Sequence, residues 1–197
     1  MSLKVGVLGS TRGTALQGVL DAIATGSLDA EIAIVISDKQ TAPILERAGR
    51  YDVAALFLDP AGLTREAYDR QVSEVLQGAG AEVVLLIGYM RIVSAAFVQT
   101  WKGRLLNVHP SLLPAFPGLM NRKVHEAVLA AGVAETGCTI HQVTEEVDGG
   151  PIVLQKRCAV LPGDTVDSLK DRVQMLEQEA FVDVLKRWRG REEGSEA

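Results

Sequence analysis

Three polar side chains in this sequence have types and spacing that suit acyl chemistry. Asn107 and His109 lie two apart at the end of the apolar run RLLNVH, so an extended chain points both to the same side. Asp148 lies in the turn EEVDGGP, where Gly149 and Gly150 let the backbone bend sharply. An asparagine can donate to a carbonyl oxygen, an imidazolium can stabilise or protonate an oxyanion, and a carboxylate can raise the pKa of an imidazole. Because no G-x-S-x-G elbow accompanies them, the three residues predict acyl transfer without an acyl-enzyme.

Each of these residues also has a purely structural interpretation. A histidine at a strand end is often satisfied by backbone hydrogen bonds, and an aspartate beside two glycines is often a turn residue in water. The functional interpretation is favoured because Asn107 and His109 lie at the carboxyl end of a strand, where open α/β sheets bind ligands. Pro110, Pro114 and Pro117 leave the loop that follows little freedom to collapse over them.

The loop LGSTRGTALQ precedes the first predicted helix and is rich in glycine and small hydroxyl side chains. Its backbone N–H groups can approach a phosphate, and the helix N-terminus adds partial positive charge. Arg12 could add a cation. The loop matches neither G-x-G-x-x-G nor the Walker pattern, so it predicts a phosphate site but no dinucleotide or nucleoside triphosphate. An ordinary capped turn is the alternative.

The segment GYMRIVSAAF follows another apolar run. Met90, Ile92 and Val93 form an apolar wall that Arg91 interrupts, which favours a pocket for a flat heteroaromatic group. A plain strand-to-helix connection is the alternative.

Alternating strands and helices must position these residues. Apolar runs without strict alternation predict strands covered on both faces at 3–9, 31–37, 52–58, 82–88 and 104–109. Amphipathic stretches predict helices at 14–25, 42–50, 64–78, 94–101 and 121–132. The order predicts an α/β fold with a Rossmann-like, doubly wound, mostly parallel sheet. Residues 136–144 and 152–160 predict a C-terminal hairpin-like strand pair, and 164–188 a long C-terminal helix.

Composition excludes several classes of protein. The 197 residues are 47% hydrophobic and 23% charged, as in ordinary globular domains, and the net charge of −5 speaks against a nucleic-acid partner. Two cysteines without zinc-ligand spacing predict reduced thiols and no metal. No stretch approaches the roughly 18 apolar residues of a membrane span, so we expect a cytoplasmic protein. Residues 1–189 are expected to form a single domain and 190–197 a disordered tail; the sequence leaves a homodimer open.

Three segments closely resemble the folate-dependent phosphoribosylglycinamide formyltransferases of purine biosynthesis. They read GYMRIVSAAFVQTWKGRLLNVHPSLLPAFPGL, GCTIHQVTEEVDGGPIVLQ and DRVQMLEQEAF, and the likeness runs from residue 3 to about residue 188. N-x-H-P-S-L-L-P together with V-D-G-G-P is highly specific for the formyltransferase superfamily. The resemblance implies a formyltransferase domain that transfers a formyl group from 10-formyltetrahydrofolate, a cosubstrate, to the amine of glycinamide ribonucleotide.

The resemblance also implies roles for individual residues. Asn107 and His109 match the family's catalytic asparagine and its histidine proton donor, Asp148 matches the aspartate that raises the histidine's pKa, and His141 matches a supporting histidine. The residues matched to the folate site are Arg65, Met90, Arg91, Ile92, Val93 and Asn107. The residues assigned to the acceptor site are Arg12, Gly13, Thr14 and Ala15 at the phosphate, with Gln174 and Glu177 near the ribose hydroxyls.

Two segments depart from the family pattern. The phosphate loop usually reads S-G-x-G-S-N, whereas here Ala15 lacks the expected amide, and Arg12 is the residue that could compensate. After Leu119 the chain reads MNRKVH and is longer than usual, where many members have a histidine. We therefore expect an altered lip of the acceptor site.

Other functions remain open at this point. A 10-formyltetrahydrofolate hydrolase would keep the same three residues but normally carries an N-terminal regulatory domain, and this chain starts at its first strand. Methionyl-tRNA formyltransferase normally adds a C-terminal RNA-binding domain, and another amine acceptor is a further alternative. A non-catalytic nucleotide- or folate-binding module would not need a raised imidazole pKa. A dehydrogenase would use an acid such as Asp38 after the second strand, but the glycine pattern is wrong.

Overall fold

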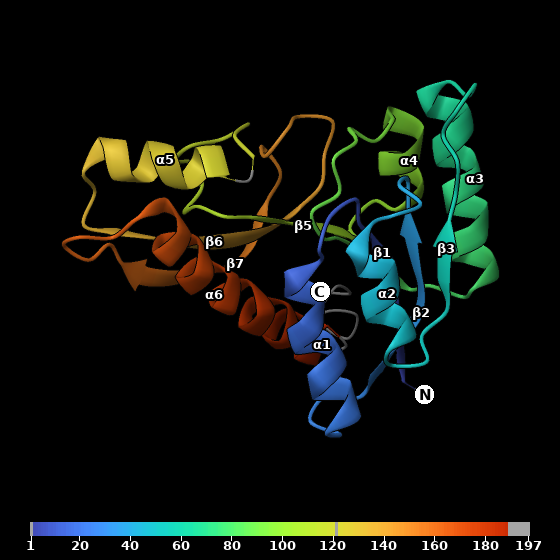
Figure 1. The fold of residues 1–197 in the computed structure, drawn as a ribbon. Coiled ribbons are helices and arrows are strands. Elements are labelled where there is room, and N and C mark those ends of the chain that lie inside the picture. Colours follow the sequence, from blue (N-terminus) through green and yellow to red (C-terminus); the bar gives the residue numbers. More distant parts are fainter. Residues whose placement is uncertain (1, 121, 189–197) are drawn as a thin grey trace, which may run out of the picture.

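The computed structural model describes residues 2–120 and 122–188, which form one sheet of seven strands with helices on both faces (Figure 1). The strands are β1 (Leu3–Leu8), β2 (Ala30–Ser37), β3 (Ala55–Phe57), β4 (Val83–Leu86), β5 (Leu105–His109), β6 (Glu135–Gln142) and β7 (Ile152–Ala159). Their order is β3-β2-β1-β4-β5-β6-β7. The first five run parallel, whereas β6 pairs antiparallel with both β5 and β7. The predicted doubly wound sheet and C-terminal strand pair are confirmed, while the predicted tail at 190–197 lies outside the described residues.

Five helices of the described chain connect these strands and a sixth, α6, follows β7: α1 (Thr14–Ala24), α2 (Pro43–Gly49), α3 (Arg65–Gly78), α4 (Ala95–Thr100), α5 (Arg122–Ala131) and α6 (Val166–Lys186). Several of the helices have a hydroxyl-bearing residue at the N-cap, because its side chain accepts a hydrogen bond from a backbone N–H of the first turn that has no partner within the helix. Thr64 caps α3, Ser94 caps α4, and Thr165 forms a reciprocal capping box with Ser168 at α6. No helix among these described elements is long and apolar enough to cross a membrane.

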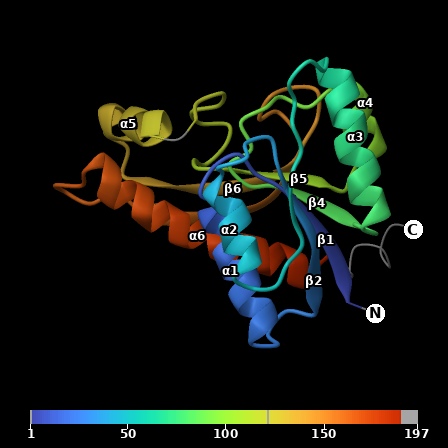
Figure 2. The ribbon, with the colours of Figure 1, turned by 45° about the vertical axis from the view of Figure 1, so that its right-hand side comes forward.

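Alternation along each strand builds a hydrophobic core on both faces of the sheet. On β4, Val83 and Leu85 belong to the core that packs against α1, α2 and α6, and Val84 and Leu86 to the core that packs against α3 and α4. Figure 2 shows α1 and α6 on one side of the sheet and α3 with α4 on the other. A smaller apolar cluster joins α5, α6 and the loop after β5. Burial on both faces explains why the parallel strands lack polar alternation.

One predicted strand is shorter in the structure. The run 52–58 pairs as a strand only at Ala55–Phe57, because the residues before it close the end of α2. Asp52 has a left-handed φ of 56°, and the N–H of Val53 donates to the carbonyl of Ala48. Apolar composition alone does not separate a strand from a helix-terminating turn.

The sheet reverses its winding direction between β1 and β4. In open α/β sheets such a switch point opens a crevice beyond the carboxyl ends of the strands. The loops after β1 and β4 approach each other closely here: a Cβ on Gly88 would lie 2.2 Å from Oγ1 of Thr11. The residues singled out from the sequence therefore gather at one edge of the sheet.

Candidate active site

A cavity of about 480 Å³ lies at this edge and is lined by residues from both halves of the chain. Its walls include the loops after β1 and β4, the end of β5, the loop between β6 and β7, and one side of α6. The predicted site residues that line it are Gly13, Thr14, Ala15, Met90, Arg91, Ile92, Val93, Asn107, His109, Asp148, Gln174 and Glu177. The fold thus brings together segments that are far apart in sequence.

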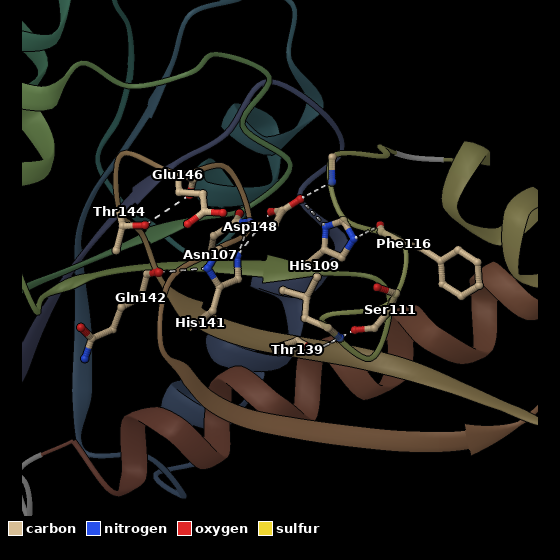
Figure 3. A network of polar contacts seen from close by, with 12 residues as sticks. Asn107, His109, Ser111, Phe116, Thr139, His141, Gln142, Thr144, Glu146 and Asp148 are labelled. Atoms are coloured by element: carbon tan, nitrogen blue, oxygen red, sulfur yellow. Dashed lines mark hydrogen bonds and ion pairs between the residues drawn. The ribbon is translucent and has the colours of Figure 1, made fainter.

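His109 stands at the centre of the polar network that Figure 3 shows. Its Nδ1 lies 3.2 Å from Oδ2 of Asp148, and its Nε2 lies 2.9 Å from the backbone carbonyl oxygen of Phe116. The ring is 4% exposed. Both ring nitrogens face oxygen acceptors, which is an arrangement that an imidazolium satisfies fully.

Asp148 turns inward from the loop between β6 and β7. Its backbone is left-handed, with φ 55°, and its Oδ2 also accepts a hydrogen bond of 2.8 Å from the N–H of Gly118. Gly150 anchors the far side of this turn, where a Cβ would lie 1.8 Å from the carbonyl oxygen of Gln142. Close backbone approach therefore requires a glycine there, and the turn fixes the carboxylate over His109.

His141 connects Asn107 to the same carboxylate. Its Nε2 lies 3.1 Å from the amide nitrogen of Asn107 and 3.5 Å from Oδ1 of Asp148. Its Nδ1 lies 2.9 Å from the carbonyl oxygen of Gln142, which sets the ring orientation. The pairing of Asn107 with His141 across β5 and β6 places these two side chains together.

Opposing effects act on the pKa of His109. Burial lowers it and is the largest effect, whereas the Asp148 carboxylate and the Phe116 carbonyl raise it, and His141 lowers it slightly further. The net pKa is below the ordinary value. Asp148 therefore acts in the direction predicted from the sequence, but it offsets burial without exceeding it.

Asp148 remains a carboxylate near neutral pH. Burial alone would raise its pKa, but the hydrogen bonds from His141 and the Gly118 N–H, together with the two histidine rings, bring the pKa below the ordinary value. The negative charge is therefore present where His109 needs it.

The loop that follows His109 is fixed from two neighbouring strands. Thr139 on β6 donates to the carbonyl of Ser111 over 2.7 Å and accepts from the N–H of Leu113 over 3.0 Å. Gln155 on β7 donates to the carbonyl of Leu113 over 2.8 Å. These bonds hold the loop that supplies the Phe116 carbonyl and the Gly118 N–H.

Ser10 connects the loops after β1 and β4. Its hydroxyl donates to Asp38 over 2.5 Å and accepts from the N–H of Met90 over 2.9 Å. Asp38, the residue that a dehydrogenase would use to bind a ribose hydroxyl, is therefore hydrogen-bonded to Ser10 instead. The contact also fixes the apolar segment that begins at Met90.

Arg91 lies at the apolar end of the cavity. Its guanidinium stands 4.6 Å from the centre of the Tyr68 ring, a cation–π contact. Its Nε is buried and has no hydrogen-bond partner among the described residues. With Met90 and Val93 half-buried and Ile92 60% exposed, this end is an apolar surface with a polar group available to a ligand.

Two arginines predicted for the site do not line the cavity. The side chain of Arg12 is exposed, and its carbonyl accepts from Nε of Arg47, because Gly13 turns the chain with a φ of 58°. Arg65 is exposed at the start of α3, where its Nε lies 3.4 Å from Glu66. Arg12 therefore does not line the cavity in which the sequence predicted it as a compensating cation.

Two basic residues of the cavity lining were not predicted from the sequence. Lys170 lines the cavity one helical turn before Gln174, and His125 lines it from α5. Helical spacing from Gln174 and Glu177 would have placed Lys170 on the same face. No local pattern distinguishes His125 from an ordinary core residue of an amphipathic helix.

Neither a metal nor a reactive thiol is indicated in this part of the chain. Among residues 2–120 and 122–188, no group of three or more His, Cys, Asp or Glu side chains is arranged to hold a metal ion. Cys138 and Cys158 are free, and burial raises the pKa of the Cys138 thiol to about 12. Cys138 is therefore not a thiolate nucleophile at neutral pH.

Glu177 makes a testable contribution to the pH dependence of stability. Burial raises the pKa of its carboxyl from the ordinary value of 4.5 to about 8. Between about pH 4.5 and 8 the folded protein keeps the Glu177 proton, whereas the unfolded chain releases it. The contribution of protonated Glu177 to stability is therefore complete below about pH 4.5 and is lost as the pH rises through 8. Replacing Glu177 by glutamine should remove roughly 2–4 kcal/mol of this dependence. Urea unfolding at pH 5, 7 and 8.5 would measure it; parallel wild-type and variant curves would contradict it.

Comparison with known proteins adds independent information. A family model described as formyl transferase matches residues 3–185. The chain is 41% identical over 180 residues to phosphoribosylglycinamide formyltransferase of Escherichia coli (strain K12), covering 91% of this chain and 84% of that protein. It is also 41% identical over 184 residues, or 93% of this chain, to the trifunctional purine biosynthetic protein adenosine-3 of Bos taurus, but it spans only 18% of that protein's length.

Solved structures agree with this likeness. The crystal structure of glycinamide ribonucleotide transformylase 1 from Symbiobacterium toebii matches with a TM-score of 0.91 at 43% identity. The match covers 96% of this chain and 89% of that one.

Proposed function

The chain belongs to the formyl transferase family, and we propose that it transfers a formyl group from 10-formyltetrahydrofolate to the amine of glycinamide ribonucleotide. The observation that carries this proposal is the convergence of Asn107, His109 and Asp148 in one cavity, with Asp148 contacting His109 at 3.2 Å. These groups suit an acyl transfer in which negative charge develops on a carbonyl oxygen.

The proposed reaction is a direct transfer. The neutral amine of the acceptor attacks the formyl carbon, a C–N bond forms, and the carbonyl electron pair moves onto the oxygen. The Asn107 amide and the protonated ring of His109 stabilise this oxyanion. When the oxyanion collapses, the bond from the formyl carbon to the folate nitrogen breaks, and the proton lost by the amine passes beside Asp148 to that nitrogen.

The cosubstrate is consistent with the apolar end of the cavity. The volume of about 480 Å³ lies in the usual range for small-molecule sites, and Met90, Ile92 and Val93 offer a surface for a flat ring. Backbone groups of the same segment can read the edge of that ring. The rest of the folate would extend past Ile92, the exposed residue of this wall.

The acceptor is assigned to the opposite end. Gly13 and Thr14 begin α1, a helix with no side-chain cap, so its first N–H groups are available to a phosphate. Gln174 and Glu177 lie on the α6 wall, where they can contact ribose hydroxyls. Two small-molecule substrates would thus meet at His109, in a reaction that we place in the cytoplasm.

The experiment that tests this function follows loss of the formyl group from 10-formyltetrahydrofolate, with and without glycinamide ribonucleotide. We expect loss only with the acceptor, matched by an equal amount of formylated product. Loss without the acceptor would establish a hydrolase instead. If no loss occurs in either case, the transfer to glycinamide ribonucleotide is wrong, and other amines become the acceptors to screen.

A further inference from the structure

Lys170 and His125 lie together on the cavity wall formed by α5 and α6, and the proposed transfer uses neither of them. Lys170 shares a face of α6 with Gln174, four residues later. Its charge acts on His125: burial lowers the pKa of that ring to about 4, and Lys170 contributes to the lowering. Near neutral pH the pair therefore consists of one cation and one neutral imidazole.

Both side chains lack partners within the described protein. Lys170 forms no hydrogen bond or ion pair with the described residues, whereas Arg122 on the neighbouring helix is paired with Asp167. His125 is 3% exposed, and its Nδ1 is buried without a hydrogen-bond partner in the described part of the chain. A buried ring nitrogen with no partner carries a desolvation cost that a bound ligand would relieve.

The chemistry of these groups matches an anion. A phosphate monoester carries up to two negative charges near neutral pH and accepts several hydrogen bonds at once. The phosphate loop supplies N–H groups at Gly13 and Thr14 but no cation, because Arg12 points away and Ala15 presents a methyl group. Of the described cationic side chains, Arg91 and Lys170 line the cavity, and Arg91 is held over Tyr68 at the apolar end.

We propose that Lys170 and His125 hold the phosphate of the acceptor, the first by an ion pair and the second through its free ring nitrogen. They would act with the N–H groups at the start of α1, and Lys170 would supply the cation that the altered loop lacks. Both are binding residues that position the acceptor amine beside His109. The inference rests on the proposed function, because a phosphorylated amine is the substrate it explains.

The first test replaces Lys170 by methionine, which keeps the length of the side chain but removes its charge. We expect KM for glycinamide ribonucleotide to rise about 10- to 100-fold, the usual loss for a charge-assisted hydrogen bond, with kcat nearly unchanged. His125→Phe keeps a ring of similar size and should raise KM by about 2- to 10-fold. Lys186→Met, an exposed lysine on the same helix, is the matched control and should match the wild type.

A second acceptor separates recognition of the phosphate from a general disturbance of the site. Glycinamide riboside, which lacks the phosphate, should be a poor substrate for the wild type and no worse for Lys170→Met. The inference is overturned if KM for the phosphorylated acceptor stays within about twofold of wild type. The inference is also overturned if Lys170→Met raises KM by the same factor for glycinamide ribonucleotide and for glycinamide riboside.

Binding of inorganic phosphate keeps this inference separate from the proposed reaction. Calorimetric titration should show that the wild type and Lys186→Met bind phosphate and that Lys170→Met binds it about 10-fold more weakly. If the wild type does not formylate glycinamide ribonucleotide but phosphate binding still depends on Lys170, the proposed function fails and the anion site stands. If phosphate does not bind, or binds all three proteins equally, the anion site is wrong.

Discussion

Replacing His109 by alanine is expected to lower kcat about 10²- to 10³-fold, the usual loss when an oxyanion donor is removed. His109 is almost completely buried beside Asp148, and its protonated ring places a positive charge next to the developing negative charge. Asn107→Ala should cost a similar factor, because the amide is the second donor at this point of β5. Steady-state and single-turnover rates with saturating substrates would measure both effects.

The double variant tests whether these two residues act as one unit. Asn107 and His109 meet the same carboxylate, the first through His141 and the second directly. We therefore expect the fold decrease in kcat of the double variant to be much smaller than the product of the fold decreases of the two single variants. Melting temperatures of all three variants serve as the folding control. Turnover by His109→Ala within tenfold of the wild type, with the fold intact, would rule out the role assigned to this histidine.

Asp148→Asn is expected to displace the pH profile rather than only reduce activity. Burial already holds the pKa of His109 below its ordinary value, and Asp148 is the main group that opposes burial. Without the carboxylate the pKa falls further, so the imidazolium form and the activity that depends on it are lost at lower pH. A nearby opposite charge typically shifts a pKa by about 1–3 units, which predicts a loss of about 10- to 10³-fold at pH 7.

The measurement combines kcat as a function of pH with an NMR titration of His109 in the ligand-free protein. The alkaline fall of kcat and the His109 midpoint should both move toward lower pH. Asp171→Asn on α6 removes the same charge from an exposed position outside the cavity, so it should leave both unchanged. If Asp148→Asn loses activity while the midpoint of His109 stays in place, Asp148 acts on the substrate and not through the histidine.

Much of this architecture follows from local sequence patterns. The apolar runs and the helices between them predict the doubly wound sheet. The hydrophobic period identifies each element, and the order of strands and helices along the chain restricts the topology. Asn107 and His109 share a side for the simple reason that side chains alternate along a strand. Asp148 was grouped with them by the chemistry of its side chain and by the family pattern, since nothing local indicates that its loop folds back over β5.

The features that the sequence does not reveal have a common physical cause. The direction of Arg12 depends on the left-handed turn at Gly13 and on the contact with Arg47, and neither can be read from the loop's composition. The net pKa of His109 depends on how deeply the ring is buried, which only the assembled fold determines. Lys170 was accessible to helical spacing, but its lack of a partner becomes visible only when neighbouring elements are in place.

The position of α6 has a consequence for the timing of activity during synthesis. This helix follows all seven strands in sequence, yet it supplies the wall of the cavity that carries Lys170, Gln174 and Glu177. A growing chain in which β5 and His109 have already been synthesised therefore still lacks part of the proposed acceptor site. Domains generally fold as units as synthesis proceeds, so the proposed acceptor site is complete only when α6 docks against α1. We therefore expect activity only after the whole domain has been synthesised and folded.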